Sequence, residues 1–406
     1  MIFSVRFKTK LSVVFIVSCL FSQPLFAAEA GPAGVRVGGF FSTAATKTDQ
    51  QTPYINGSDY TENTDYFSGT TVGIHVNFNV SEAFKFTTQM IGRGHEGGYE
   101  TSFEWLFATY TLQENISIRA GRLRFPNYLI SKTLDVGLTY PWVRPPVEVY
   151  DTSFSFFSKY NGIDMLISVP IGDADLLIQP YFGQIKTELN SVLAGDGAQV
   201  DTDSLYGISV ELALGALNWR ASILATDAHM TSSSGIAIGL RTEITSLGVK
   251  YNGDDFFVMS ELTKMSIGSA NYDFTGISTT AAAQSTALAT LKSVGSTIAN
   301  APTTTGVYIT VGKSIDSITP YITYGKVYST GGDLSHPVLG SSMTVFRQEQ
   351  HSITFGVRYD IESNVAVKAE YHSATVEGGS RGVYVVVPPA GEEDINVMSV
   401  SLDMVF

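Results

Sequence analysis

The chain has 406 residues, which is long enough for two ordinary domains or one large barrel. Hydrophobic residues make up 44% and charged residues only 16%, so the chain is too polar for a helical membrane protein and too weakly charged for a typical cytosolic enzyme. The formal net charge of −13 makes it a poor candidate for binding nucleic acid. A barrel wall, with one face toward lipid and one toward water, gives such a mixture.

The N-terminal residues have the features of an export signal. A basic start is followed by an apolar run over 11–20 and by the small residues Ala27, Ala28 and Ala30. We expect residues 1–28 to be a signal peptide, cleaved between 27 and 30. A membrane-anchoring helix is disfavoured, because about 18 apolar residues are needed to span a bilayer and Pro24 interrupts this run. Cys19, the only cysteine, ends a loose lipoprotein-type box, so a lipidated N-terminus stays open.

Residues 29–406 repeatedly alternate apolar and polar side chains, and we expect them to form one domain. In the final stretch, Met398, Val400 and Leu402 face one way, whereas Ser399 and Ser401 face the other. Stretches of about 9–11 residues are the length that a tilted strand needs to cross the hydrocarbon. About sixteen strands are predicted, near 35–43, 70–80, 83–91, 102–111, 115–123, 160–169, 174–185, 204–214, 216–227, 243–252, 254–264, 304–313, 317–328, 349–359, 364–374 and 395–406. An even number is expected of a single-chain outer-membrane barrel.

The predicted connections alternate between short and long. Turns of a few residues should follow every second strand, and the long connections should cover 44–69, 92–101, 124–159, 186–203, 228–242, 265–303, 329–348 and 375–394. Short periplasmic turns and longer extracellular loops are typical of outer-membrane barrels. A soluble sandwich has no reason to sort its loops by length between two ends. The sequence therefore predicts an all-β, transmembrane, antiparallel β-barrel.

Two long connections have distinctive sequences. The third, over 124–159, is rich in proline and aromatic residues, which suggests a stiff, packed segment. The connection over 265–303 contains an Ala/Ser/Thr-rich stretch in which Leu288, Leu291 and Val294 have helical spacing. That stretch is either a short helix over the barrel mouth or a flexible surface loop.

Two motifs and the strand pattern resemble a known superfamily. The motifs are Gly121-Arg122-Leu123-Arg124-Phe125-Pro126 and the Tyr-Pro-Trp-Val-Arg-Pro-Pro run at 140–146. Together with a final strand ending at Phe406, they resemble the Gram-negative outer-membrane porins. The resemblance implies a third loop folded into the lumen as a constriction, a homotrimer, and contact with outer-membrane lipid and lipopolysaccharide. It also implies that Phe406 belongs to a C-terminal signal for the barrel-assembly machinery.

Charged residues near the third loop are the candidate constriction site. The basic candidates on the wall are Lys85, Arg119, Arg122 and Arg124, and the candidates on the loop are Asp135, Arg144, Glu148 and Asp151. A basic wall opposite an acidic loop would create a transverse field that filters solutes by charge. The alternative for each residue is a merely solvating or ion-pairing role inside the wall. Arg122 and Arg124 have the outward parity of their strand, but they lie where the loop begins.

No motif points to catalysis, a cofactor or a metal. The histidines lack ligand spacing, and neither a Gly-x-Ser-x-Gly elbow nor a phosphate-binding loop occurs. We therefore expect a non-enzymatic porin, a water-filled channel for passive diffusion of small hydrophilic solutes and ions. Two alternatives stay open: a channel selective for anions, sugars or dicarboxylates, and a barrel whose surface loops act as an adhesin or phage receptor.

Overall fold

The computed structural model describes residues 34–55, 60–95, 98–151, 158–191, 195–232, 234–333, 335, 347–384 and 387–406. The expected signal peptide over 1–28 and its cleavage site lie outside these residues. In the described part of the chain no helix has both the length and the apolar character that a bilayer span needs.

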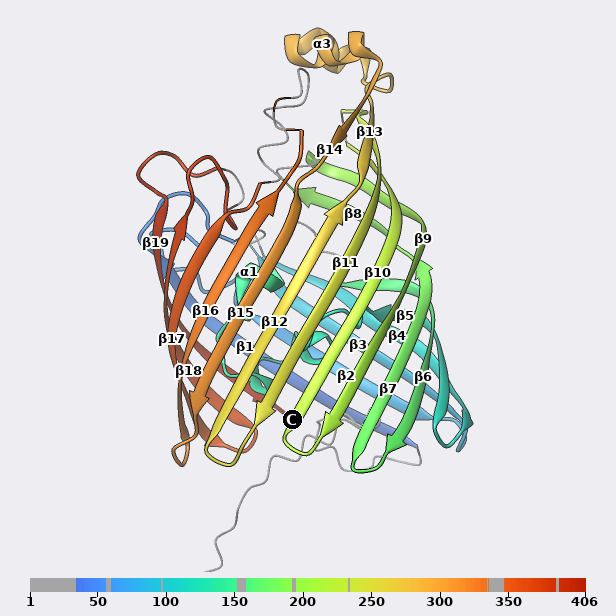
Figure 1. Cartoon of the computed structure of the whole chain (residues 1–406), viewed down its shortest axis with the longest axis vertical. Helices are drawn as coiled ribbons and strands as arrows, with labels where there is room; N and C mark the ends of the chain where they lie inside the picture. The colour runs from blue at the N-terminus through green and yellow to red at the C-terminus, as the bar shows by residue number, and fades with distance from the viewer. Residues whose placement is uncertain are drawn as a thin grey trace, which may run out of the picture.

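Nineteen strands are formed by the described residues, and all of them belong to one antiparallel sheet. Three short strands only extend this sheet, which leaves sixteen in the barrel wall (Figure 1). The wall strands are β1 (Val35–Thr48), β2 (Thr71–Asn79), β3 (Phe84–His95), β4 (Gly98–Gln113), β5 (Ile116–Arg124), β6 (Lys159–Ile171), β7 (Ala174–Gln184), β9 (Gly195–Leu214), β10 (Leu217–Thr231), β11 (Ala237–Asn252), β12 (Phe256–Ile267), β15 (Thr303–Lys313), β16 (Ile318–Thr330), β17 (Gln350–Glu362), β18 (Val365–Val376) and β19 (Asp394–Val405). Each of the sixteen predicted strands corresponds to one of these.

The barrel closes between its first and last strands. β1 pairs with β2 on one side and with β19 on the other, in a register that sets Phe40 opposite Val405. Beyond β19, Phe406 exchanges two backbone hydrogen bonds with Gly39, at 2.8 and 2.9 Å. Closure removes the free sheet edges, whose unpaired N–H and C=O groups would be costly in lipid. The predicted all-β, antiparallel barrel of about sixteen strands is confirmed.

The remaining strands and two helices extend one end of the barrel. β8 (Lys186–Ser191) pairs with β9, and β13 (Ser269–Asp273) pairs with β14 (Ser296–Asn300). Between β13 and β14 lie α2 (Thr279–Gln284) and α3 (Thr286–Val294), capped by the Ser278 and Ser285 side chains. Of the two alternatives left open for this stretch, the structure has the short helix, and it stands above the barrel rim (Figure 1).

Strand pairing continues further at this end than the sequence predicted. β3 runs to His95 and β4 begins at Gly98, so the long connection expected over 92–101 is wrong. The expected loop over 186–203 is likewise replaced by β8 and the start of β9. The period-two signal fades here because these ends no longer separate an apolar face from a polar one.

The two faces of the wall differ as the alternation predicted. On β19 the outward side chains of Met398 and Val400 are more than half exposed, whereas Ser399, Ser401 and Asp403 on the inner face are buried. The same contrast recurs around the barrel, with large apolar side chains exposed outside. A barrel exposes such an apolar band where it faces lipid.

Candidate functional site

The connection between β5 and β6 is the centre of the candidate site, and we call its residues 125–151 the β5–β6 segment. It contains two 3-10 turns, η1 (Ser131–Thr133) and η2 (Gly137–Thr139), and the short helix α1 (Val147–Tyr150). Pro146 is the N-cap of α1, where a missing N–H has no cost. These local turns satisfy part of the backbone, and the barrel wall must satisfy the rest.

Apolar packing fixes the middle of the segment. The Trp142 side chain is buried, and its ring meets that of Tyr308 edge to face at 5.6 Å. Its indole N–H lies 3.1 Å from the hydroxyls of both Thr310 and Thr323, on β15 and β16. Ile130, Tyr140, Val149, Met259 and Tyr321 complete this cluster. The segment is therefore packed against the inner faces of β12, β15 and β16.

Basic side chains of the wall bind its backbone. The ammonium of Lys368 on β18 donates to the carbonyls of Gly137 and Trp142, both at 2.7 Å, and pairs with Asp403 at 3.1 Å. Lys368 is completely buried. A buried ammonium needs this set of partners, because an unpaired charge away from water is very unfavourable.

Neighbouring strands repeat this pattern of contact. Arg358 on β17 donates to the carbonyl of Leu138 at 2.6 Å, and Arg220 on β10 donates to that of Tyr128 at 2.8 Å. On β12, Glu261 accepts from the Leu129 N–H at 2.9 Å. Further hydrogen bonds or ion pairs reach the segment from Thr46, Arg93, Arg124, Tyr181, Glu211, Ser222 and Ser399. The segment is thus held by inner-face side chains from strands around most of the barrel.

Helix α1 lies very close to the wall. A side chain added at Gly306 on β15 would overlap the carbonyl oxygen of Glu148. The Glu148 carboxylate is buried and accepts from the Gln350 amide at 3.0 Å. Burial raises its pKa, and the hydrogen bond from Gln350 offsets only part of that effect.

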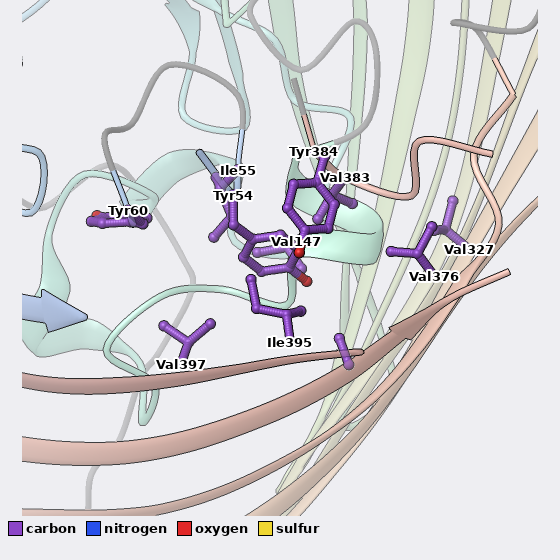
Figure 2. Close-up of a cluster of buried hydrophobic side chains, with 11 residues drawn as sticks. Tyr54, Ile55, Tyr60, Val147, Val327, Val376, Val383, Tyr384, Ile395 and Val397 are labelled. Carbon is purple, nitrogen blue, oxygen red and sulfur yellow. The ribbon is translucent and has the colours of Figure 1, made fainter. Parts of the chain in front are cut away.

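Two surface connections pack over α1. Tyr54, Val147 and Tyr384 meet in a buried cluster, with the Tyr54 and Tyr384 rings 4.9 Å apart (Figure 2). The Tyr54 hydroxyl also accepts from the Gln350 amide at 2.7 Å. Gln350 therefore links the tyrosine cluster to Glu148, and α1 is held by these two connections as well as by the barrel wall.

A cluster of charged side chains forms where β3, β4, β5 and β6 approach Asp135. Glu104 is buried and pairs with Arg93 and Lys159, both at 2.9 Å, and with Arg124 at 3.4 Å. Asp135 pairs with Arg93 at 2.7 Å and with Arg124 at 2.5 Å. We call these five residues the Glu104 cluster. It holds three cations and two carboxylates.

The other predicted site residues lie apart from this cluster. Arg119 makes a two-point contact with Asp164 on the next strand, with its Nε 2.8 Å from the carboxylate. Arg122 has the outward parity of β5 and donates to the Phe103 carbonyl at 3.3 Å. Arg124 has the same parity but turns inward to the Glu104 cluster. Lys85 lies on β3, partly buried.

The remaining predicted loop residues, Arg144, Glu148 and Asp151, lie further along the segment than Asp135. Arg144 donates to the Ser399 hydroxyl at 2.8 Å and lies over the Tyr60 ring at 4.5 Å. Asp151 interacts electrostatically with Arg381, whose pKa burial lowers to about 10.

The predicted arrangement of a basic wall facing an acidic loop is therefore only partly assembled. Arg124 and Asp135 are in direct contact, but Glu148 is bound by the amide of Gln350 and not by a cation of the predicted set. Glu104, Arg93 and Lys159 were missed. Glu104 escapes the simple alternation because the pairing register shifts between Gln89 and Met90, which turns it inward. Arg93 and Lys159 fall within the connections predicted over 92–101 and 124–159, where alternation assigns no face.

Within the described residues no group of three or more His, Cys, Asp or Glu side chains could hold a metal ion.

Neither a family model nor a curated protein matches this chain. Solved structures do match it. The outer membrane channel DcaP of Acinetobacter baumannii is 11% identical, with 94% of this chain and 100% of that chain covered and a TM-score of 0.55. The anion-selective porin of Comamonas acidovorans is 13% identical, with 92% and 99% covered and a TM-score of 0.55. The trimer form of OmpT of Vibrio cholerae is 10% identical, with 92% and 99% covered and a TM-score of 0.55. This chain therefore has the sixteen-stranded barrel fold of the outer-membrane porins and channels.

Proposed function

We propose that the protein is an outer-membrane channel for the passive diffusion of small hydrophilic solutes, with the β5–β6 segment as its constriction inside the lumen. One observation carries the proposal: inner-face side chains from strands around the barrel, Lys368, Arg358 and Arg220 among them, bind the backbone of this segment. A loop held in this way narrows a pore to a fixed size. The exposed apolar outer face supports location in the bacterial outer membrane.

The likeness to the trimer form of OmpT supports a homotrimer. In this assembly the outer surface of the three barrels would contact outer-membrane lipid and lipopolysaccharide. Insertion through the barrel-assembly machinery, with Phe406 in its recognition signal, belongs to the same proposal.

The Glu104 cluster favours anions among the solutes. Its three cations exceed its two carboxylates by one charge. The side chains of Arg93 and Lys159 are 38% and 31% exposed, whereas those of Glu104 and Asp135 are only 1% and 11% exposed. A solute therefore meets the cations first, although the net charge of the chain is negative. One of the matching structures is named an anion-selective porin, and that name is consistent with this preference.

Single-channel recording in planar bilayers tests the channel itself. Purified protein should insert in discrete conductance steps, grouped in threes if the trimer is correct. Protein that is folded and membrane-inserted but gives no conductance would exclude a diffusion channel.

Reversal potentials in a salt gradient test the anion preference separately. Arg93→Gln should move the reversal potential toward cation selectivity, and Glu104→Gln should move it toward anion selectivity. Arg241→Gln is the matched control, because Arg241 is exposed on the outward parity of β11. Equal shifts for Arg93→Gln and Arg241→Gln would mean that the Glu104 cluster does not set selectivity.

A further inference from the structure

One side of the barrel interior is apolar, which a channel for hydrophilic solutes does not require. The inner faces of β9, β10 and β11 line a hollow that is partly open to solvent. Phe125 and Tyr128 of the β5–β6 segment also line it. Its apolar wall residues are Ile185, Val200, Leu205, Leu224, Ala228, Met230, Leu240 and Ile244.

Those of them on β9, β10 and β11 have the inward parity, so lipid contact does not explain them. On β10, Leu224 and Ala228 are buried, whereas Trp219 and Ile223 on the opposite parity are exposed. Arg220, on the same parity as Leu224, binds the β5–β6 segment. The inner face thus changes from charged to apolar along a single strand.

Three of the four threonine and asparagine side chains that line the hollow have hydrogen-bond partners, and Thr242 is the exception. The Thr202 hydroxyl accepts from the Ile185 N–H at 2.7 Å, and the Thr226 hydroxyl donates to the Ser204 carbonyl at 2.9 Å. The Asn127 side-chain oxygen accepts from the Tyr181 hydroxyl at 2.6 Å. The Thr242 hydroxyl has no hydrogen-bond partner among the described residues, although Thr242 is only 3% exposed.

An unpartnered buried hydroxyl is costly, since its bonds to water are lost without replacement. Such groups are few in native proteins. At the wall of an apolar hollow, the group that would satisfy this hydroxyl is a single donor or acceptor on an otherwise apolar molecule.

We propose that this hollow binds the apolar end of a small solute carrying one hydroxyl group, with phenols as the representative class, and that this hydroxyl pairs with Thr242. A sugar is disfavoured, because the apolar wall would leave several of its hydroxyls unpaired. The site lies on the interior of the barrel, so it would retain such solutes on their way through the channel. It does not depend on the charge preference of the Glu104 cluster.

Phenol and toluene test the site, because they differ mainly by a hydroxyl in place of a methyl group. Equilibrium dialysis with the labelled compounds would compare full-length protein variants in the same detergent. The wild type should bind both compounds saturably, above the uptake of protein-free micelles. Thr242→Val, which keeps the side-chain volume, should weaken phenol binding about threefold to tenfold and leave toluene binding unchanged.

Thr245→Val is the matched control, since Thr245 lies on the same strand but is exposed on the outward parity. It should change neither affinity. Ala228→Phe should fill the hollow and abolish saturable binding of both compounds. Single-channel conductance steps of each variant, recorded without ligand, would show that its barrel is folded. They also test the proposed channel function separately from the phenol site.

Two results would overturn the site. The first is phenol binding that does not saturate, which would place the phenol in the micelle, or that is unchanged in Ala228→Phe, which would place it elsewhere on the barrel. The other is an equal loss of phenol and toluene binding in Thr242→Val, which would exclude the hydroxyl pairing. Should Ala228→Phe fail to fold, the comparison of Thr242→Val with Thr245→Val decides alone.

Discussion

Replacing Lys368 by methionine should release the middle of the β5–β6 segment. The ammonium donates to the carbonyls of Gly137 and Trp142 and pairs with Asp403. Methionine keeps much of the side-chain volume but removes the charge and all three contacts. Asp403 then becomes an uncompensated charge that is 3% exposed.

The expected loss of stability follows from these contacts. Removing one partner of a buried ion pair costs about 3–5 kcal/mol, mainly because the other charge stays buried. Neutralising that charge as well should recover part of the loss. Lys368→Met/Asp403→Asn should therefore be at least about 1 kcal/mol more stable than Lys368→Met alone. The double variant still lacks the two bonds to the segment, each worth about 1.5–3 kcal/mol for a charged donor.

Guanidinium unfolding and single-channel recording would measure the two consequences. The free energy of unfolding should fall in Lys368→Met and partly return in the double variant. Open-channel noise should rise in both variants, since both free the Gly137 and Trp142 carbonyls, while Arg358 still holds Leu138. A loss below about 1 kcal/mol with an unchanged current trace would refute the view that Lys368 anchors a constriction.

Other substitutions test separate parts of the site. Burial raises the pKa of Glu148, so its favourable contribution is present while the carboxyl is protonated, below its ordinary value of 4.5, and is lost as the pH rises through the raised folded-state value. Glu148→Gln should therefore gain stability relative to the wild type at neutral pH but not at acidic pH; a pH-independent difference in unfolding midpoint would contradict this. Trp142→Phe should cost about 1 kcal/mol in denaturant unfolding, because the two threonine hydroxyls it leaves can still bond to each other. Gly306→Ala should displace α1 and change the unit conductance, whereas Gly378→Ala, which has open space around it, should not; identical conductances would argue against contact between α1 and the pore. Deleting residues 279–294, which form α2 and α3 above the rim, should leave conductance intact, and loss of current would assign that region to the pore.

The sequence was sufficient for the wall of the barrel. Along a regular strand a side chain faces inside or outside by parity, so the alternation of Met398, Ser399 and Val400 assigns faces without knowledge of any partner. The number of strands and the inward positions of Arg119, Lys368 and Asp403 follow from the same rule. These are local properties, and each stretch of about ten residues carries its own signal.

The partners of those side chains were decided only by the tertiary structure. Arg124 meets Glu104 because the register shifts at one point of the β3–β4 pair, which turns Glu104 inward, and it meets Asp135 because the β5–β6 segment folds back to it. Thr242 is left without a partner because the side chains that line the hollow beside it, such as Leu224, Leu240 and Ile244, are mostly apolar. The course of the β5–β6 segment depends on contacts with strands far along the chain. Period-two alternation fixes a face but carries no information on which strands a loop will meet, and pairing register and closure of the barrel supply it.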